Sequence, residues 1–270
     1  MKSAELNSVL IVGCGWVGTK LATNLVSQNI SVFGTTRSAE KASSLRSLGI
    51  KPIIFDLEKE DALQTDLPKV DAVVISVSPG RSDQRSQYPN HIQKLSKLLA
   101  STNQQVVMYS STSAYKGSKG IVTESDALPD PESDNVILAA EGQLKKIIPE
   151  SVVLRLSGLF GSDRHPVKYL AGRKDISNGE APVNLVHRED VIAATISVIS
   201  QKIQNETFNV CSDHHPTKNE LYTNLSEKLN LEKLTFQSGG SDEKLVDGYK
   251  IKNALRFEYQ ENDLFAYSSD

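Results

Sequence analysis

The stretch Ser8–Gly18 reads SVLIVGCGWVG, an apolar run that passes directly into the pattern G-x-G-x-x-G. The apolar part, Ser8–Val12, predicts a buried β-strand, and the amphipathic residues Trp16–Ser27 predict the helix that follows it. A glycine-rich turn of this pattern between a strand and a helix is typical of sites that bind the pyrophosphate of a dinucleotide. The stretch therefore predicts such a site, and a tight turn without a ligand is the alternative.

The residues of this turn have separate expected tasks. Gly13 permits the tight turn, Gly15 lets the backbone come close to a pyrophosphate, and Gly18 lets the helix pack against the strand. Trp16 and Val17 begin the helix, whose free N–H groups and partial positive charge favour phosphate. All five residues are therefore candidates for cofactor binding.

The rest of the chain alternates short apolar runs with longer amphipathic stretches. Further strands are predicted at Ile30–Thr35, Lys51–Phe55, Asp71–Val77, Gln105–Ser110, Val152–Leu156 and Thr207–Cys211. Further helices are predicted at Ser38–Ser47, Asn90–Ala100, Asn135–Ile148 and Asp190–Ile203, the last capped by Asp190. Strands rich in Val and Ile without polar alternation are buried on both faces. The pattern predicts an α/β fold, a Rossmann-type doubly wound parallel sheet.

The chain of 270 residues is short for two full domains, since a domain takes about 150 residues. We expect a single dinucleotide-binding Rossmann domain over residues 1–270. Two stretches with little strand periodicity, about 159–186 and 212–270, are expected to form a small C-terminal substrate lobe.

Charge and cysteine content exclude several classes of partner. With 30 basic and 33 acidic residues the net charge is −3, which offers no field for nucleic acid or a polybasic membrane surface. The early apolar run Val9–Val12 is too short for a membrane span. The two cysteines suit a reducing cytoplasm. Cys14 follows Gly13 at a helix N-terminus, which is expected to lower its pKa, although it fits as a small space-filler.

The residues after the second predicted strand bear on the choice of cofactor. An NAD site places an acid there for the ribose 2′-OH, but the nearest acid, Glu40, already lies in the next helix. Arg37 instead stands where a guanidinium can pair with a 2′-phosphate. NADP is therefore the expected cofactor and NAD remains possible; a solvated loop arginine is the alternative. Other cofactor candidates at the ends of the third and fourth strands are Asp56, Leu57, Ser76 and Ser78.

Several motifs together resemble one family. They are the glycine turn, Asp56-Leu57, Tyr88–Asn90, Ser110–Tyr115, Ala140-Glu141, Leu154–Gly161 and His187–Asp190. On these segments the chain resembles the extended short-chain dehydrogenase/reductase family, in its branch of NAD(P)-dependent nucleoside-diphosphate-sugar epimerases and dehydratases. More narrowly, it is similar to a small bacterial subgroup of about this length, mostly uncharacterised. The resemblance implies a small-molecule substrate, such as a nucleotide sugar or a carbonyl compound.

The resemblance also implies an active site of Asn, Ser or Thr, and a Tyr-x-x-x-Lys pair. Asn90 matches the Asn position and Ser111 the hydroxyl position, whereas the Tyr and Lys positions fall on Ser133 and Ile137. Serine is too weak an acid and isoleucine carries no charge, so the usual proton-transfer pair is missing. A literal Tyr-x-x-x-Lys does occur elsewhere, from Tyr115 to Lys119, and is a candidate for a displaced pair, with packing of Tyr115 at a strand end as the alternative.

Three residues are candidates for substrate contacts. Asn184 and His187 precede the Asp190 helix, where relatives line the substrate pocket, and His187 also has the pKa range of an acid or base. Arg155 is a candidate for a phosphate or carboxylate contact. For Asn184 and His187 the structural alternative is a hydrogen bond to the loop backbone. For Arg155 it is an ion pair within the protein. His214 and His215 have no carboxylate or cysteine at zinc spacing, so no metal site is expected.

Three functions remain open from the sequence. The first is an NADP-dependent oxidoreductase or epimerase with a relocated or water-borne proton donor. The second is a dinucleotide-binding sensor that has lost its chemistry, which the missing Tyr and Lys favour. The third is a scaffold with an empty site, against which the intact glycine turn argues. The oligomeric state stays undetermined.

Overall fold

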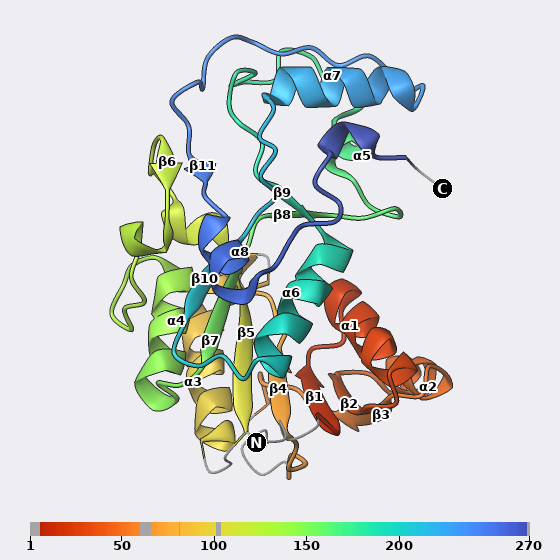
Figure 1. The fold of residues 1–270 in the computed structure, drawn as a ribbon, viewed down its shortest axis with the longest axis vertical. Coiled ribbons are helices and arrows are strands. Elements are labelled where there is room, and N and C mark those ends of the chain that lie inside the picture. The colour runs from red at the N-terminus through yellow and green to blue at the C-terminus, as the bar shows by residue number, and fades with distance from the viewer. Residues whose placement is uncertain (1–5, 60–65, 81, 101–103, 269–270) are drawn as a thin grey trace. The chain divides into compact units, whose positions relative to one another are not determined.

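The computed structural model describes residues 6–59, 66–80, 82–100 and 104–268 (Figure 1). The chain divides into two compact units. Unit 1 comprises Met1–Ala114, Leu128–Leu154 and Thr195–Thr207, and unit 2 comprises Tyr115–Ala127, Arg155–Ala194 and Phe208–Asp270. Unit 2 thus contains the whole of both stretches expected to form a lobe, together with Tyr115–Ala127, which the sequence did not assign to it.

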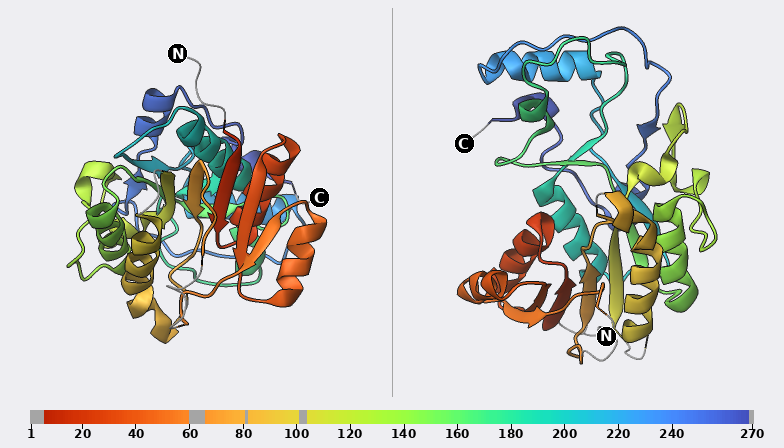
Figure 2. Two further views of the ribbon diagram at one scale, coloured as in Figure 1. Left: turned by 90° about the horizontal axis from the view of Figure 1, so that it is seen from below. Right: turned by 180° about the vertical axis from the view of Figure 1, so that it is seen from behind.

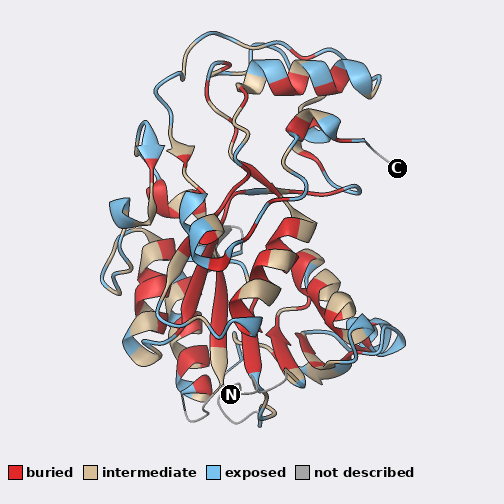
Figure 3. Cartoon of the chain, viewed as in Figure 1, coloured by how far each residue is buried: buried red, intermediate tan, exposed pale blue. Residues whose placement is uncertain are grey.

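In the described part of the chain, the central sheet has seven strands in the order β10-β7-β5-β4-β1-β2-β3 (Figure 1). They are β1 Ser8–Val12, β2 Ser31–Thr36, β3 Lys51–Ile54, β4 Ala72–Ile75, β5 Gln105–Ser111, β7 Val152–Leu156 and β10 Thr207–Val210. The pairs β1/β2, β1/β4, β2/β3 and β4/β5 are all parallel. Every residue of β4 and β7 is buried, as the red strands of Figure 3 show, because helices cover both faces. The predicted doubly wound fold is confirmed.

The helices of this fold lie on both faces of the sheet. Their bounds are α1 Trp16–Ser27, α2 Ala39–Ser47, α3 Tyr88–Leu99, α4 Val136–Ile147 and α6 Arg188–Ser200. Helices α3 and α4 pack side by side on one face, and α1 lies on the other (Figure 2). The apolar spacing in α3 explains this packing, because Ile92, Leu95 and Leu99 all point to its buried side. No helix in the described ranges has the length and apolar character needed to cross a membrane.

The predicted cap of the last of these helices is wrong. Helix α6 begins at Arg188, so Asp190 already lies in its first turn. The Asp190 carboxylate is buried and accepts hydrogen bonds from the backbone N–H groups of Gln260 and Glu261, at 2.8 and 3.1 Å. It therefore anchors the C-terminal segment within unit 2 instead of capping a helix.

The described residues of unit 2 form two small parallel strand pairs and three short α-helices of their own. The strands are β8 Gly158–Phe160 with β9 Leu185–His187, and β6 Ile121–Val122 with β11 Leu245–Val246. The helices are α5 Pro166–Leu170, α7 Lys218–Lys228 and α8 Tyr249–Leu255. Apolar side chains such as Phe160, Val167 and Leu221 form its buried core. The low periodicity of this region in the sequence reflects elements too short to repeat a pattern.

Candidate functional site

A cleft of about 410 Å³ opens in unit 1 beside the glycine turn. Its walls come from the residues after β1, β2, β3 and β4, with two side chains of α3. Ligands of doubly wound sheets bind at this carboxyl edge of the strands. The predicted cofactor residues that line the cleft are Gly13, Gly15, Arg37, Asp56, Leu57, Ser76 and Ser78. Trp16, Val17 and Gly18 are not among the lining residues and build the helix behind the turn.

The geometry of the turn gives each glycine a separate requirement. Gly13 has φ +97°, and a Cβ there would lie 2.9 Å from the Ser76 carbonyl oxygen. A Cβ on Gly18 would lie 2.4 Å from the Gly13 carbonyl oxygen. A Cβ on Gly15, in contrast, would meet no atom within 4 Å. The protein itself therefore needs glycine at positions 13 and 18, whereas at position 15 the missing side chain leaves cleft volume open.

Two hydrogen bonds to Thr35 of the next strand support the same turn. The Gly13 backbone N–H donates to the Thr35 hydroxyl at 2.8 Å, and the Cys14 N–H donates to the Thr35 carbonyl at 3.0 Å. Thr35 is buried at the end of β2. Sequence reasoning did not select it, although its position two residues before Arg37 was a usable signal.

Cys14 is a buried packing residue. A Cβ on Gly34 would lie 2.5 Å from the Cys14 sulfur, so the thiol fills the space above that glycine. Burial raises the pKa of the Cys14 thiol to about 11, against a smaller lowering effect of Lys41. The prediction that the helix N-terminus lowers this pKa is wrong, because desolvation dominates, while space filling matches the geometry.

Two charged side chains meet at the wall of the cleft. The Arg37 guanidinium lies 3.4 Å from the Glu58 carboxylate, and both residues line the cleft. Arg37 remains 70% exposed. Asp56 accepts a hydrogen bond from the Glu58 backbone N–H at 3.2 Å, so its carboxylate also shapes the turn after β3. Glu58 is a site residue that sequence reasoning missed, because it lies far from Arg37 in the chain.

The end of β5 carries the predicted catalytic hydroxyl. The Ser111 hydroxyl lies 2.9 Å from that of Ser113 and accepts a hydrogen bond from the Ser113 backbone N–H at 3.1 Å. The Asn135 amide donates to the carbonyls of Ser113 and Ala114, at 3.0 and 3.1 Å, which ties this segment to the start of α4. Ser111 is half-buried. Its hydroxyl is thus held in one position at a strand end.

The two positions on which the Tyr and Lys were expected, Ser133 and Ile137, have local structural roles. Ser133 precedes α4 and accepts a hydrogen bond from the Asn135 N–H at 3.2 Å, while Ile137 is buried in the first turn. Neither side chain titrates near neutrality.

The side chains that helix α3 presents to the cleft do not include Asn90, which was expected there. Asn90 is exposed, donates to the Gln87 amide oxygen at 3.0 Å and is not among the cleft-lining residues. Tyr88 and His91 line the cleft instead. The spacing i, i+3 on one helix face was the signal that could have selected His91.

Two predicted residues of unit 2 belong to one buried network. The Tyr115 hydroxyl donates to the Asn209 amide oxygen at 2.7 Å and accepts from the Arg155 guanidinium at 2.8 Å. Arg155 is fully buried and also donates to the carbonyls of Ala127 and Glu124, at 2.6 and 3.4 Å. Burial raises the pKa of Tyr115, although Arg155 opposes the shift. Lys119, the partner expected for Tyr115, pairs with Asp242 instead.

Asn184 and His187 both bond to nearby backbone. The Asn184 amide donates to the Lys244 carbonyl at 2.9 Å and its oxygen accepts from the Val246 N–H at 2.8 Å, so it holds β11. His187 accepts from the Glu189 N–H at 3.4 Å. Within the described ranges no group of three or more His, Cys, Asp or Glu side chains is arranged to hold a metal ion.

A doubly wound sheet with a glycine-turn cleft at its carboxyl edge defines a dinucleotide-binding protein. The chain belongs to the NAD(P)H-binding family, whose profile matches residues 13–202. This match and the fold fit the resemblance to extended short-chain dehydrogenases/reductases.

Individual relatives are similar to this chain over most of its length. Protein YeeZ of Escherichia coli (strain K12) is 34% identical over 268 residues, which cover 96% of this chain and 97% of that protein. A short-chain dehydrogenase/reductase superfamily protein from Agrobacterium tumefaciens with bound NAD shares the fold with a TM-score of 0.76, at 16% identity over 96% of this chain and 94% of that one. MoeE5 in complex with UDP-glucose and NAD has a TM-score of 0.75, at 21% identity over 96% and 95% of the chains.

Proposed function

We propose that the chain is an NADP-preferring oxidoreductase or epimerase that acts on a small carbonyl or hydroxyl compound. The cleft of unit 1 carries the proposal, because Gly15 leaves it open and Arg37 stands at its wall. The complex of MoeE5 with UDP-glucose supports a nucleotide sugar as the substrate class. We assign the protein to the cytoplasm, where its two free, buried cysteines stay reduced.

The residues of unit 1 divide the work as follows. Backbone N–H groups of the glycine turn and the start of α1 bind the pyrophosphate, and Arg37 pairs with the 2′-phosphate. The nicotinamide, when bound, supplies or accepts hydride. Ser111 donates a hydrogen bond to the reacting substrate oxygen. Water or His187 carries the proton, because Tyr115 already holds two hydrogen bonds within unit 2 and burial raises its pKa.

The choice between the two cofactors tests the role of Arg37. We expect NADPH to bind about tenfold more tightly than NADH. This is the low end of the gain in affinity from a charge-assisted hydrogen bond, because Arg37 is 70% exposed to solvent. The Glu58 carboxylate competes with the 2′-phosphate for the same guanidinium, so Glu58→Gln should bind NADPH more tightly than the unmodified protein does. Calorimetric titration of both cofactors measures the preference.

Arg46→Ala is the matched control, since this arginine is exposed on α2 and does not line the cleft. It should leave both affinities unchanged, whereas Arg37→Ala should remove the preference. Equal affinities in the unmodified protein, or a preference that survives Arg37→Ala, would contradict the assignment of NADP.

Turnover tests the assignment of Ser111. Once a substrate is found among sugar nucleotides, aldehydes and ketones, Ser111→Ala should lower kcat by about 10², the cost of one preorganised donor. Ser133→Ala should change it little, because Ser133 only bonds to the Asn135 backbone. An active enzyme that tolerates Ser111→Ala has another catalytic group. Tight NADPH binding without any turnover favours the sensor.

A further inference from the structure

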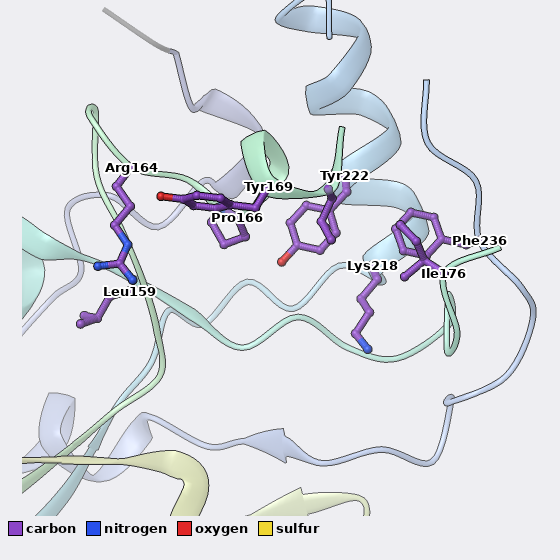
Figure 4. Close-up of a pocket in the computed structure, with 9 residues that line it drawn as sticks. Leu159, Arg164, Pro166, Tyr169, Ile176, Lys218, Tyr222 and Phe236 are labelled. Carbon is purple, nitrogen blue, oxygen red and sulfur yellow. The ribbon is translucent and has the colours of Figure 1, made fainter. Parts of the chain in front are cut away.

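Unit 2 contains a pocket of its own that the proposed function does not use. Its volume is about 380 Å³, within the range of roughly 300–1,000 Å³ usual for small-molecule sites. Figure 4 shows its lining, to which α5, α7 and the loop residues Ile176 and Phe236 contribute. None of its lining residues belongs to the cleft of unit 1.

Aromatic rings form much of this lining. Tyr222 and Phe236 are stacked, with ring centroids 6.4 Å apart and planes inclined by 19°. Tyr169 lines the same pocket from α5 and is exposed. Pro166 and aliphatic side chains complete the apolar part of the wall. Such a surface suits a flat apolar body, which buries its faces against rings.

The charged residues of the lining are both basic. Arg164 and Lys218 lie on opposite sides of Tyr222 (Figure 4). Lys218 forms no ion pair with any residue that the structure describes, and no acidic side chain belongs to the lining. A cation beside an apolar wall gains most from an anionic ligand, because the pair is partly shielded from water.

The Tyr222 hydroxyl supplies a third polar group. The Tyr222 ring is buried, and its hydroxyl has no hydrogen-bond partner among the described residues. In Figure 4 the hydroxyl lies between Arg164 and Lys218. A ligand oxygen held by a cation can therefore also accept a hydrogen bond from this phenol.

We propose that the pocket binds a small organic anion with a flat aromatic body and one acidic group. The rings hold the body, and Lys218 and Tyr222 hold the anionic oxygens. A carboxylate and a phosphate ester share this chemistry.

Binding of naphthalene probes to the full chain tests the proposal. Calorimetry with 2-naphthoate and 2-naphthyl phosphate distinguishes the two acidic groups, and neutral 2-naphthalenemethanol measures the contribution of charge. We expect at least one anion to bind about tenfold more tightly than the alcohol. If neither anion binds more tightly than the alcohol, the proposal is wrong.

Matched variants locate the probe. Tyr222→Phe keeps the ring and Lys218→Gln keeps most of the stem; each should weaken anion binding about tenfold. Lys233→Gln, an exposed lysine of unit 2 outside the pocket, should have no effect. Anion binding that survives both pocket variants overturns the proposal. NADPH titration of the same variants should give the affinity of the unmodified protein, so the two proposals fail separately.

Discussion

Gly15→Val should abolish detectable NADPH and NADH binding and leave the protein folded. The valine side chain would enter volume that is open in the structure, since a Cβ at position 15 meets no atom within 4 Å. That volume is where the backbone of the turn approaches the pyrophosphate. Titration of the variant with both cofactors, together with its thermal unfolding midpoint, measures the two effects.

Gly18→Ala provides the contrasting control. Its Cβ would lie 2.4 Å from the Gly13 carbonyl oxygen, so the backbone of the turn must move to accept it. We therefore expect a lower unfolding midpoint in Gly18→Ala and an unchanged one in Gly15→Val. If Gly15→Val binds NADPH with the affinity of the unmodified protein, the glycine turn is not the cofactor site.

The sequence predicted the central sheet well because its elements carry strong local signals. The bounds predicted for β1 and α1 are those of the structure, Ser8–Val12 and Trp16–Ser27. An apolar run buried on both faces needs no knowledge of its neighbours to be recognised. The cofactor cleft followed for the same reason, since the turn between these two elements has a known pattern.

The residues that were missed depend on contacts between distant parts of the chain. Glu58 meets Arg37 because β2 and β3 are parallel neighbours and end at the same edge of the sheet. His91 replaced Asn90 in the cleft because the rotation of α3 is set by its apolar face. Asp190 was expected to cap a helix, yet its partners come from the C-terminal segment. Local patterns do not contain this information.

Substitutions of Arg155 show whether this residue has a structural role or contacts substrate. Its guanidinium is fully buried on β7, lies 5.1 Å from the centre of the Tyr115 ring, and donates to three oxygens of unit 2. Arg155→Met fills similar space but leaves the Ala127 carbonyl without this donor. We expect the free energy of unfolding in urea to fall by about 1–3 kcal/mol, the cost of leaving buried neutral oxygens without their donor.

Two further variants show whether the geometry of the guanidinium is what matters. Arg155→Lys keeps the positive charge but, as a point charge, cannot reach the oxygens of Tyr115, Ala127 and Glu124 together, so its loss should be intermediate. Arg46→Met, on the exposed side of α2, should change stability by no more than about 0.5 kcal/mol. If Arg155→Met unfolds like the unmodified protein and instead loses substrate, Arg155 binds substrate and the network is dispensable. A large loss of stability makes Arg155 a structural residue that holds Tyr115 in place.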